Sequence, residues 1–262
     1  GNSIASGGNY NVVVGDEAGT ALTTGDNNVA VGYAALDLED TGTSNTAVGY
    51  NSLTTLNYDG AGHNTAVGTS TGGAITTGRF NSFIGSLAGF TETGGSYSTG
   101  VGYGALYTQN VNGDAHNTAV GYTAGLSVTT GVQNTLIGGL AGDAITTGNY
   151  NSAVGYDSLG ANTTGTRNFA GGNQALLANT TGERNNAIGD GALGANTTAS
   201  GNSAFGHRAL YTNTTGASNT GLGHDALRLN TTASDNTAVG LSALRANTTG
   251  ASNTAVGKGA LT

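Results

Sequence analysis

Apolar and polar positions recur along the chain at a fixed interval. A glycine preceded in 14 of 15 cases by a bulky apolar residue returns every 17 residues, with two steps of 19. Asn stands four residues before this glycine in 14 of the 15 units, and a small residue, most often Ala, stands two before it. The repeat glycines are Gly15, Gly32, Gly49, Gly68, Gly85, Gly102, Gly121, Gly138, Gly155, Gly172, Gly189, Gly206, Gly223, Gly240 and Gly257. Such a strict period indicates a repeat architecture built from one small module.

The repeat unit is too short for a helix pair or a βαβ unit. Residues such as Asn45–Val48 favour an extended run, and Gly49 after them suits a bend or a close backbone approach. We therefore predict an all-β fold, a β-solenoid or β-roll of about fifteen 17-residue coils that fills residues 1–262 as a single repeat domain. Coils stacked about 4.8 Å apart make a rod on the order of 70 Å long.

Two columns of the repeat exchange side-chain volume. The residue four after the repeat glycine is Leu in ten units and Gly in five. Where it is Leu the residue three further on is usually Asn, as in Leu176 and Asn179, and where it is Gly that residue is apolar, as in Gly142 and Ile145. The pair Gly89 and Glu92 departs from the rule. Because a close-packed interior conserves volume, both columns are expected in the core.

Adjacent apolar columns predict an assembly. Ala47 and Val48 are neighbours in an extended run, so their side chains point to opposite faces, and both columns are apolar through most of the chain. If one column lines the interior, the other is an exposed apolar stripe unless something covers it. Copies of the same chain are the simplest cover, and we expect a homotrimer. We also expect the Asn columns to form corners and coil-to-coil amide ladders.

The repeat resembles those of known fibre proteins. Units such as Asn236-Thr-Ala-Val-Gly-Leu-Ser-Ala-Leu are similar to the NTAVGxxAL-type repeats of bacterial and phage fibre proteins. They are also similar, more loosely, to the repeats in the heads of trimeric autotransporter (YadA-like) adhesins. The resemblance spans essentially the whole chain, and it implies a left-handed β-roll and a trimer. The adhesin heads have a shorter period, so their assignment of faces is not transferred to this sequence.

Composition removes several function classes. Pro, Cys, Met and Trp are absent, so a disulfide framework, a thiolate metal site and a Cys nucleophile are excluded. Leu, Ile, Val and Phe make up about 18% of the chain, less than an ordinary globular core requires. The net charge of −8 argues against nucleic acid as the main partner. No apolar run is long enough for insertion into a membrane as a helix.

Histidines are the strongest candidates for site chemistry. His63 and His116 lie in the two longer units, three coils apart, which is too far for them to share a metal ion. His207 and His224 occupy the same column on adjacent coils, but no carboxylate or nucleophile of fixed spacing accompanies them. There is no Gly-rich phosphate loop opening a helix, and no Asp-rich Ca²⁺-binding nonapeptide. We predict no catalytic, cofactor-binding or metal-binding residues, and a protein that is not an enzyme.

The column directly after the repeat glycine varies freely, which is typical of a solvent-facing position. Five tyrosines in it form a candidate surface-binding row: Tyr33, Tyr50, Tyr103, Tyr122 and Tyr156. Aligned tyrosines bind sugars or proteins through their ring faces and hydroxyls. The alternative interpretation of the row is ordinary stacking between coils.

We expect a structural and adhesive role. The sequence favours an extracellular rod, a segment of a surface adhesin, tail fibre or filamentous appendage, located at a cell surface or virion. Its partners would be itself, as a trimer with possible head-to-tail stacking, and a host-surface protein or glycan. The alternative is an ice- or crystal-surface binder that uses Thr ladders such as Thr163-Thr164, although adjacent Thr side chains point to opposite faces. A polysaccharide-cleaving enzyme would need paired carboxylates in register, and the repeat has none.

Overall fold

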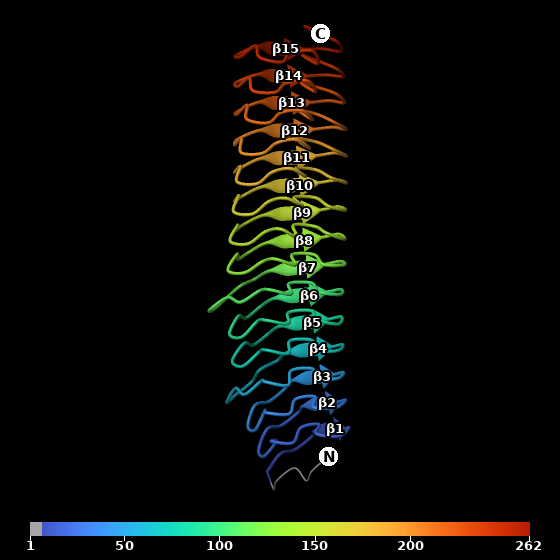
Figure 1. Cartoon of the computed structure of the whole chain (residues 1–262), viewed down its shortest axis with the longest axis vertical. Coiled ribbons are helices and arrows are strands. Elements are labelled where there is room, and N and C mark those ends of the chain that lie inside the picture. Colours follow the sequence, from blue (N-terminus) through green and yellow to red (C-terminus); the bar gives the residue numbers. More distant parts are fainter. Residues whose placement is uncertain (1–6) are drawn as a thin grey trace. The chain divides into compact units, whose positions relative to one another are not determined.

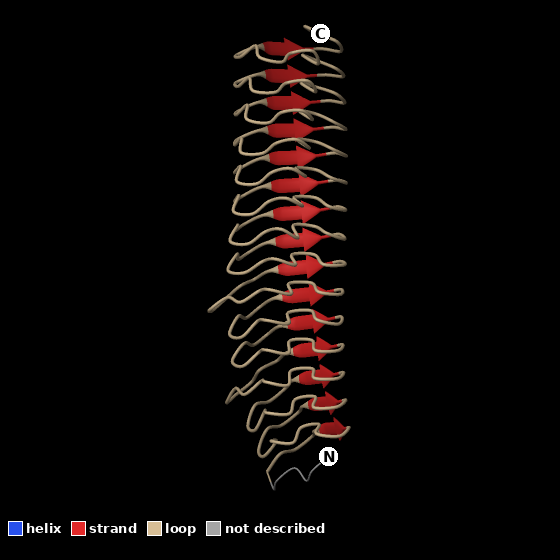
Figure 2. Ribbon diagram, viewed as in Figure 1, coloured by secondary structure: helices blue, strands red, loops and turns tan. Residues whose placement is uncertain are grey.

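The chain consists of short parallel strands joined by turns. The computed structural model describes residues 7–262, within which there are fifteen three-residue strands and no helix. Accordingly, none of the described residues forms a helix long and apolar enough to span a membrane. The backbone divides into two compact units, one ending at Gln133 and one from Asn134 to Thr262. Figure 2 shows one strand per coil, with turns making up the rest. The start of the first coil lies outside the described residues.

The first unit stacks seven strands in register. Each strand pairs in parallel with the next, so that Ala30 lies beside Ala47 and Val31 beside Val48 (Figure 1). The strands are β1 (Val12–Val14), β2 (Val29–Val31), β3 (Thr46–Val48), β4 (Thr65–Val67), β5 (Ser82–Ile84), β6 (Thr99–Val101) and β7 (Thr118–Val120).

The second unit stacks eight strands in the same way, with Ala187 beside Ala204 as one example. The strands are β8 (Thr135–Ile137), β9 (Ser152–Val154), β10 (Phe169–Gly171), β11 (Asn186–Ile188), β12 (Ser203–Phe205), β13 (Thr220–Leu222), β14 (Thr237–Val239) and β15 (Thr254–Val256). Both units are therefore parallel β-solenoids, as predicted. The single repeat domain, the handedness of the coil and the trimer stay predictions.

Alternation along each strand fixes which column is inside. The middle residue of the strand is buried, as with Ala153 and Ala187, while its neighbours face outward. The Leu column, which includes Leu176 and Leu210, completes the same interior. The prediction that the two adjacent apolar columns face opposite ways is confirmed, with the Ala column inside.

The volume exchange is also confirmed, and its exception has a physical reason. A Cβ added at Gly142 would lie 2.7 Å from Cδ2 of Leu136 and 2.8 Å from Cδ1 of Ile145, so these two side chains occupy the space that Leu fills in other coils. At Gly89 the same space is taken by the ring of Phe83, 2.6 Å from the added Cβ. The large side chain in that coil therefore comes from the strand, in the column that is usually Ala.

The repeat glycine allows two neighbouring coils to approach closely. Gly189 has φ of +133°, and a Cβ placed there would lie 2.5 Å from the carbonyl oxygen of Gly206, one coil further on. Both the backbone conformation and the contact exclude a side chain. The close approach predicted for this column is thus confirmed.

Two buried asparagine ladders run through the second unit. In the first, the backbone N–H of Asn185 donates to Oδ1 of Asn168 at 3.0 Å, and Nδ2 of Asn185 donates to the carbonyl of Ala199. In the second, Nδ2 of Asn179 donates to Oδ1 of Asn162 at 2.8 Å and to the carbonyl of Gly182. The predicted coil-to-coil amide bonds are confirmed, and they satisfy polar groups inside a narrow core.

The two longer coils are each anchored by a buried glutamate from the preceding coil. These coils lie between β3 and β4 and between β6 and β7, and Figure 1 shows them protruding beyond their neighbours. Glu39 accepts hydrogen bonds from the backbone N–H of Gly42, at 2.7 Å, and of Tyr58 in the longer coil, at 3.2 Å. Glu92 makes the equivalent bonds to Gly95 and Val111. Burial raises the pKa of Glu39 above its ordinary value, although the N–H donors oppose the rise.

Candidate functional site

The tyrosines of the surface-binding row are exposed, as the sequence predicts. Tyr33, Tyr50, Tyr103, Tyr122 and Tyr156 have between 41% and 62% of their surface accessible. They do not form one continuous row. Tyr33 stacks on Tyr50 with ring centroids 5.4 Å apart, and Tyr103 stacks on Tyr122 at 5.7 Å. Tyr156, in the second unit, lies over Gly139, which offers no ring to stack on.

A groove lies beside the second pair. It has a volume of about 320 Å³ and spans three coils of the first unit. It is lined by Leu87, Tyr103, Gly104, Tyr107, Tyr122, Thr123 and Leu126. Three phenol rings and two leucines give it apolar walls with hydroxyl groups at their ends. Such a surface suits a ligand with an apolar face and several hydroxyl groups, such as a sugar.

The groove exists because one turn lacks a side chain. Gly104 has φ of +61°, and the equivalent residue in an earlier coil is Asn51, with φ of +52°. A Cβ at Gly104 would meet only Cδ1 of Leu126 at 3.4 Å and Cγ2 of Thr123 at 3.7 Å. A side chain can therefore be accommodated here, and its absence leaves the space open. The sequence contains this signal, a Gly between tyrosines, but Tyr107 belongs to another column of the repeat and was not predicted.

Tyr33 lies beside a carboxylate. A hydrogen bond with the Glu17 side chain, together with the negative charge of that carboxylate, raises the pKa of Tyr33 above its ordinary value. The neighbouring carboxylate therefore favours the protonated phenol over the phenolate.

A second aromatic ladder was not predicted. His63, Phe80, Tyr97 and His116 stack in sequence, with centroids 5.2, 5.1 and 5.0 Å apart. All four stand five residues before a repeat glycine and have φ between +48° and +62°. The two histidines of the longer coils are thus the ends of one stack, and they lie three steps apart as the spacing predicts. The shared phase in the repeat was the available signal.

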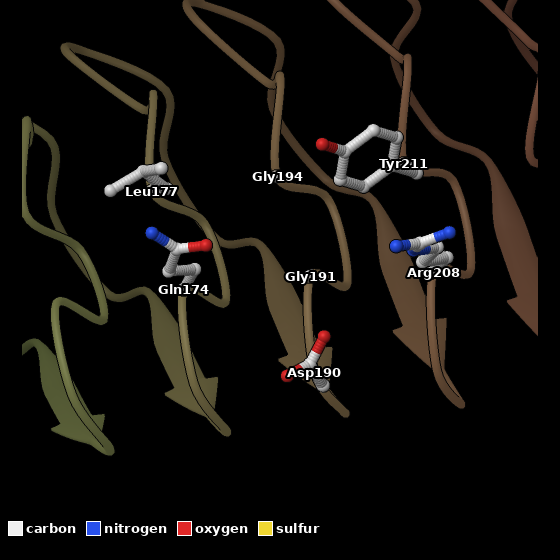
Figure 3. A pocket seen from close by; sticks show the side chains of 7 residues that line it. All are labelled: Gln174, Leu177, Asp190, Gly191, Gly194, Arg208 and Tyr211. Carbon is white, nitrogen blue, oxygen red and sulfur yellow. The ribbon is translucent and has the colours of Figure 1, made fainter.

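A smaller notch lies on the second unit. Gly191 and Gly194 have no side chains, and the space of about 90 Å³ above them is bounded by Gln174 and Leu177 on one side and by Arg208 and Tyr211 on the other (Figure 3). The Tyr211 ring leans over the notch, since a Cβ at Gly194 would lie 3.0 Å from it. Asp190 stands at the rim. The notch is too small for more than a few water-sized groups.

The outward face of the strands is apolar over much of both units. Ile84 and Ile188 are each 43% exposed, Leu222 is 47% exposed and Val256 is 71% exposed. These residues belong to the column just before the repeat glycine, so they follow one another from strand to strand. They make the exposed apolar stripe that the sequence predicts.

The comparisons with protein-family models and with curated proteins assign no family to this chain. No protein-family model matches it, and the search of curated proteins finds no significant relative. Three features of the molecule therefore bear on its function: the repeat, the exposed stripe and the tyrosine groove.

Proposed function

We propose that the chain is a structural and adhesive module of an extracellular appendage, such as a surface adhesin or a tail fibre. In this role it spaces and presents a binding surface, and it catalyses no reaction. The main support for this proposal is the groove of Tyr103, Tyr107 and Tyr122. Three aromatic rings line this open groove, whose volume is about 320 Å³. Packed side chains and amide ladders fill the interior of each coil. The residues in the outward columns are therefore the ones whose identity can vary without loss of the fold.

The fold supports a presenting role. Successive coils are joined by parallel strand pairing and by hydrogen bonds between turns, such as Leu176 N–H to the carbonyl of Ala192 at 3.0 Å. Each coil therefore holds its outward residues at a fixed place relative to the next coil. A rigid scaffold that positions variable surface residues is the usual arrangement of binding proteins.

The exposed apolar stripe supports assembly. We propose that three copies of the chain cover this stripe in a homotrimer, which removes isoleucine, valine and leucine side chains from water. The location proposed for such an assembly is a cell surface or virion.

Binding to carbohydrate is tested with a glycan array. We expect the wild-type protein to bind a subset of glycans, and both Gly104→Asn, which fills the groove, and Tyr122→Ala, which removes one wall, to lose them. Asn suits this turn because Asn51 occupies the same position with φ of +52°. Tyr156→Ala is the matched control, since Tyr156 belongs to the other unit and does not line the groove. An array that is blank for the wild type, or unchanged in both groove variants, would contradict glycan binding at this site.

Ice binding is the second candidate, and one observation favours it. On β3, β4, β6 and β7 each strand has the pattern Thr-x-Val, with both the Thr and the Val facing outward. Rows of these residues on a parallel sheet, interrupted at β5 by Ser82 and Ile84, resemble an ordered surface for a crystal plane. The Thr pairs of the second unit are less suited, because the hydroxyl of Thr163 donates to the carbonyl of Thr180 while Thr164 alone is exposed. Thermal hysteresis that is lost in Thr65→Tyr would favour ice binding over adhesion.

A further inference from the structure

Two histidines and a carboxylate meet on the surface of the second unit, although the sequence predicted no carboxylate beside these histidines and no metal-binding residues. His207 and His224 stack on neighbouring coils with ring centroids 4.8 Å apart. One ligand atom of each histidine and one carboxylate oxygen of Asp225 all lie within 4.8 Å of one another. The Asp225 side chain is 14% exposed, whereas those of His207 and His224 are 41% and 54% exposed. A shielded carboxylate thus lies beside two solvent-accessible imidazoles.

Two buried atoms of this cluster form no hydrogen bond. Nδ1 of His207 and Oδ1 of Asp225 are buried and have no hydrogen-bond partner. Buried polar atoms of a folded protein are nearly always hydrogen-bonded, so Nδ1 of His207 points to a missing partner. Oδ1 of Asp225 has only a long ion pair, with Nε of Arg228 at 3.5 Å. A cation is a partner that suits both groups, because an imidazole nitrogen and a carboxylate oxygen each offer it a lone pair.

Asp190 lies close to Nε2 of His207. Its Oδ1 lies 3.8 Å from Nε2 of His207, and its Oδ2 accepts a hydrogen bond from Nδ2 of Asn173 at 3.0 Å. A carboxylate beside one ring nitrogen favours the N–H there and leaves the lone pair on the other nitrogen. For His207 the other nitrogen is the unpartnered Nδ1.

We infer that His207, His224 and Asp225 bind a late first-row divalent metal ion such as Zn²⁺, with Asp190 as a positioning residue. Two imidazoles and one carboxylate suit Zn²⁺, whereas Mg²⁺ and Ca²⁺ prefer oxygen ligands alone. Bonds to Zn²⁺ are about 2.0–2.2 Å, so the ligand atoms must approach one another by roughly 1 Å. The two exposed histidines achieve this by rotating their side chains.

Two arginines compete with the metal ion for Asp225. Nε of Arg228 lies 3.5 Å from Oδ1 of Asp225, and Nε of Arg245 lies 3.8 Å from its Oδ2. Removing one of these charges makes the carboxylate a stronger ligand, because it lowers the repulsion of the metal ion. If the cluster serves only as an ion-pair network, removing an arginine should instead lower the stability of the protein and leave metal binding unchanged.

The site is tested by isothermal titration of the tag-free full chain with ZnCl₂ at neutral pH. We expect binding of one Zn²⁺ per chain, weakened about tenfold or more in His207→Gln and in His224→Gln, and tightened in Arg245→Gln. His116→Gln is the matched control, since His116 stacks on Tyr97 and belongs to no such cluster. MgCl₂ is expected to give no binding heat.

Three outcomes would overturn the inference. They are the absence of Zn²⁺ binding to the wild type, equal affinity in the wild type and in the double variant His207→Gln/His224→Gln, and loss of binding in His116→Gln instead. Circular dichroism of each variant checks that the fold is kept. All the substituted side chains are partly exposed, so loss of the fold is not expected.

Discussion

Leucine in the turn after the strand combines a strained backbone with a buried side chain. Leu176 has φ of +52° and no exposed surface. The positive φ costs about 1–2 kcal/mol for an L-residue, whereas burial of a leucine side chain contributes about 1.5–3 kcal/mol. Burial therefore exceeds strain where no other side chain fills the space. Where Ile145 or Phe83 fills it, Gly replaces Leu and the strain disappears.

Leu176→Ala is expected to destabilise the protein by about 2–5 kcal/mol, because it opens a cavity and leaves the strain in place. Urea unfolding followed by circular dichroism measures the loss. Tyr156→Ala, at a side chain 55% exposed, should cost far less. Equal losses at the two positions would show that the inward and outward columns are wrongly assigned.

Gly189→Ala is expected to be among the most damaging single substitutions. The new Cβ would contact the Gly206 carbonyl at 2.5 Å and force alanine into φ of +133°. Gly139→Ala is the control, because its Cβ would meet only the Tyr156 ring, at 3.7 Å. Thermal melting should show a large decrease in Tm for the first variant and little change for the second. Similar Tm values for the two would contradict the close approach of the coils.

At the scale of the element, one coil is the unit of both prediction and structure. The strand, the inward Ala column and the glycine approach follow from the sequence because each recurs at one phase of the repeat. Contacts between residues at different positions of the repeat could not be predicted in this way. Phe83 fills space next to Gly89 from another column, and Glu39 reaches Tyr58 in the following coil. The groove and the His207 cluster also draw residues from several columns and several coils.

Burial of Glu39 predicts a dependence of stability on pH. Its pKa is higher in the folded state than the ordinary value of 4.5, so folding favours the protonated carboxyl group. The stabilisation is complete below the unfolded-state pKa and is lost as pH rises through the folded-state pKa. Glu39→Gln removes this titration. We expect the free energy of unfolding of the variant, minus that of the wild type, to increase from pH 4 towards neutrality.

Urea titrations of both proteins across this pH range measure the difference. The other carboxyl groups, including Asp143, whose pKa is also raised by burial, are common to the two proteins and cancel. Two parallel curves of stability against pH would mean that Glu39 titrates alike in the folded and unfolded states.

At the scale of the whole molecule, the exposed stripe predicts the oligomeric state. Light scattering of the purified chain at micromolar concentration should give about three times the mass of 25.5 kDa. Ile188→Lys, which places a charge in the stripe at a residue 43% exposed, should shift the protein towards monomers. Its own coil should remain folded, because the neighbouring inward residue Ala187 is unchanged. A well-folded wild-type monomer would contradict the proposed trimer.

The hydrogen bonds between coils also bear on how such a chain arises and folds. They link residues about one repeat apart, as in Asn185 with Asn168 and Asn196 with Asn179. Adding a coil therefore creates no contact between distant parts of the sequence. The loop closed at each step of folding stays the same length, so folding can spread from one coil to the next. The relative contact order of the protein therefore falls as the chain lengthens. Duplication or loss of the gene segment that encodes one 17-residue coil should accordingly be tolerated. The length of the protein can therefore change during evolution while the core residues of the remaining coils stay the same.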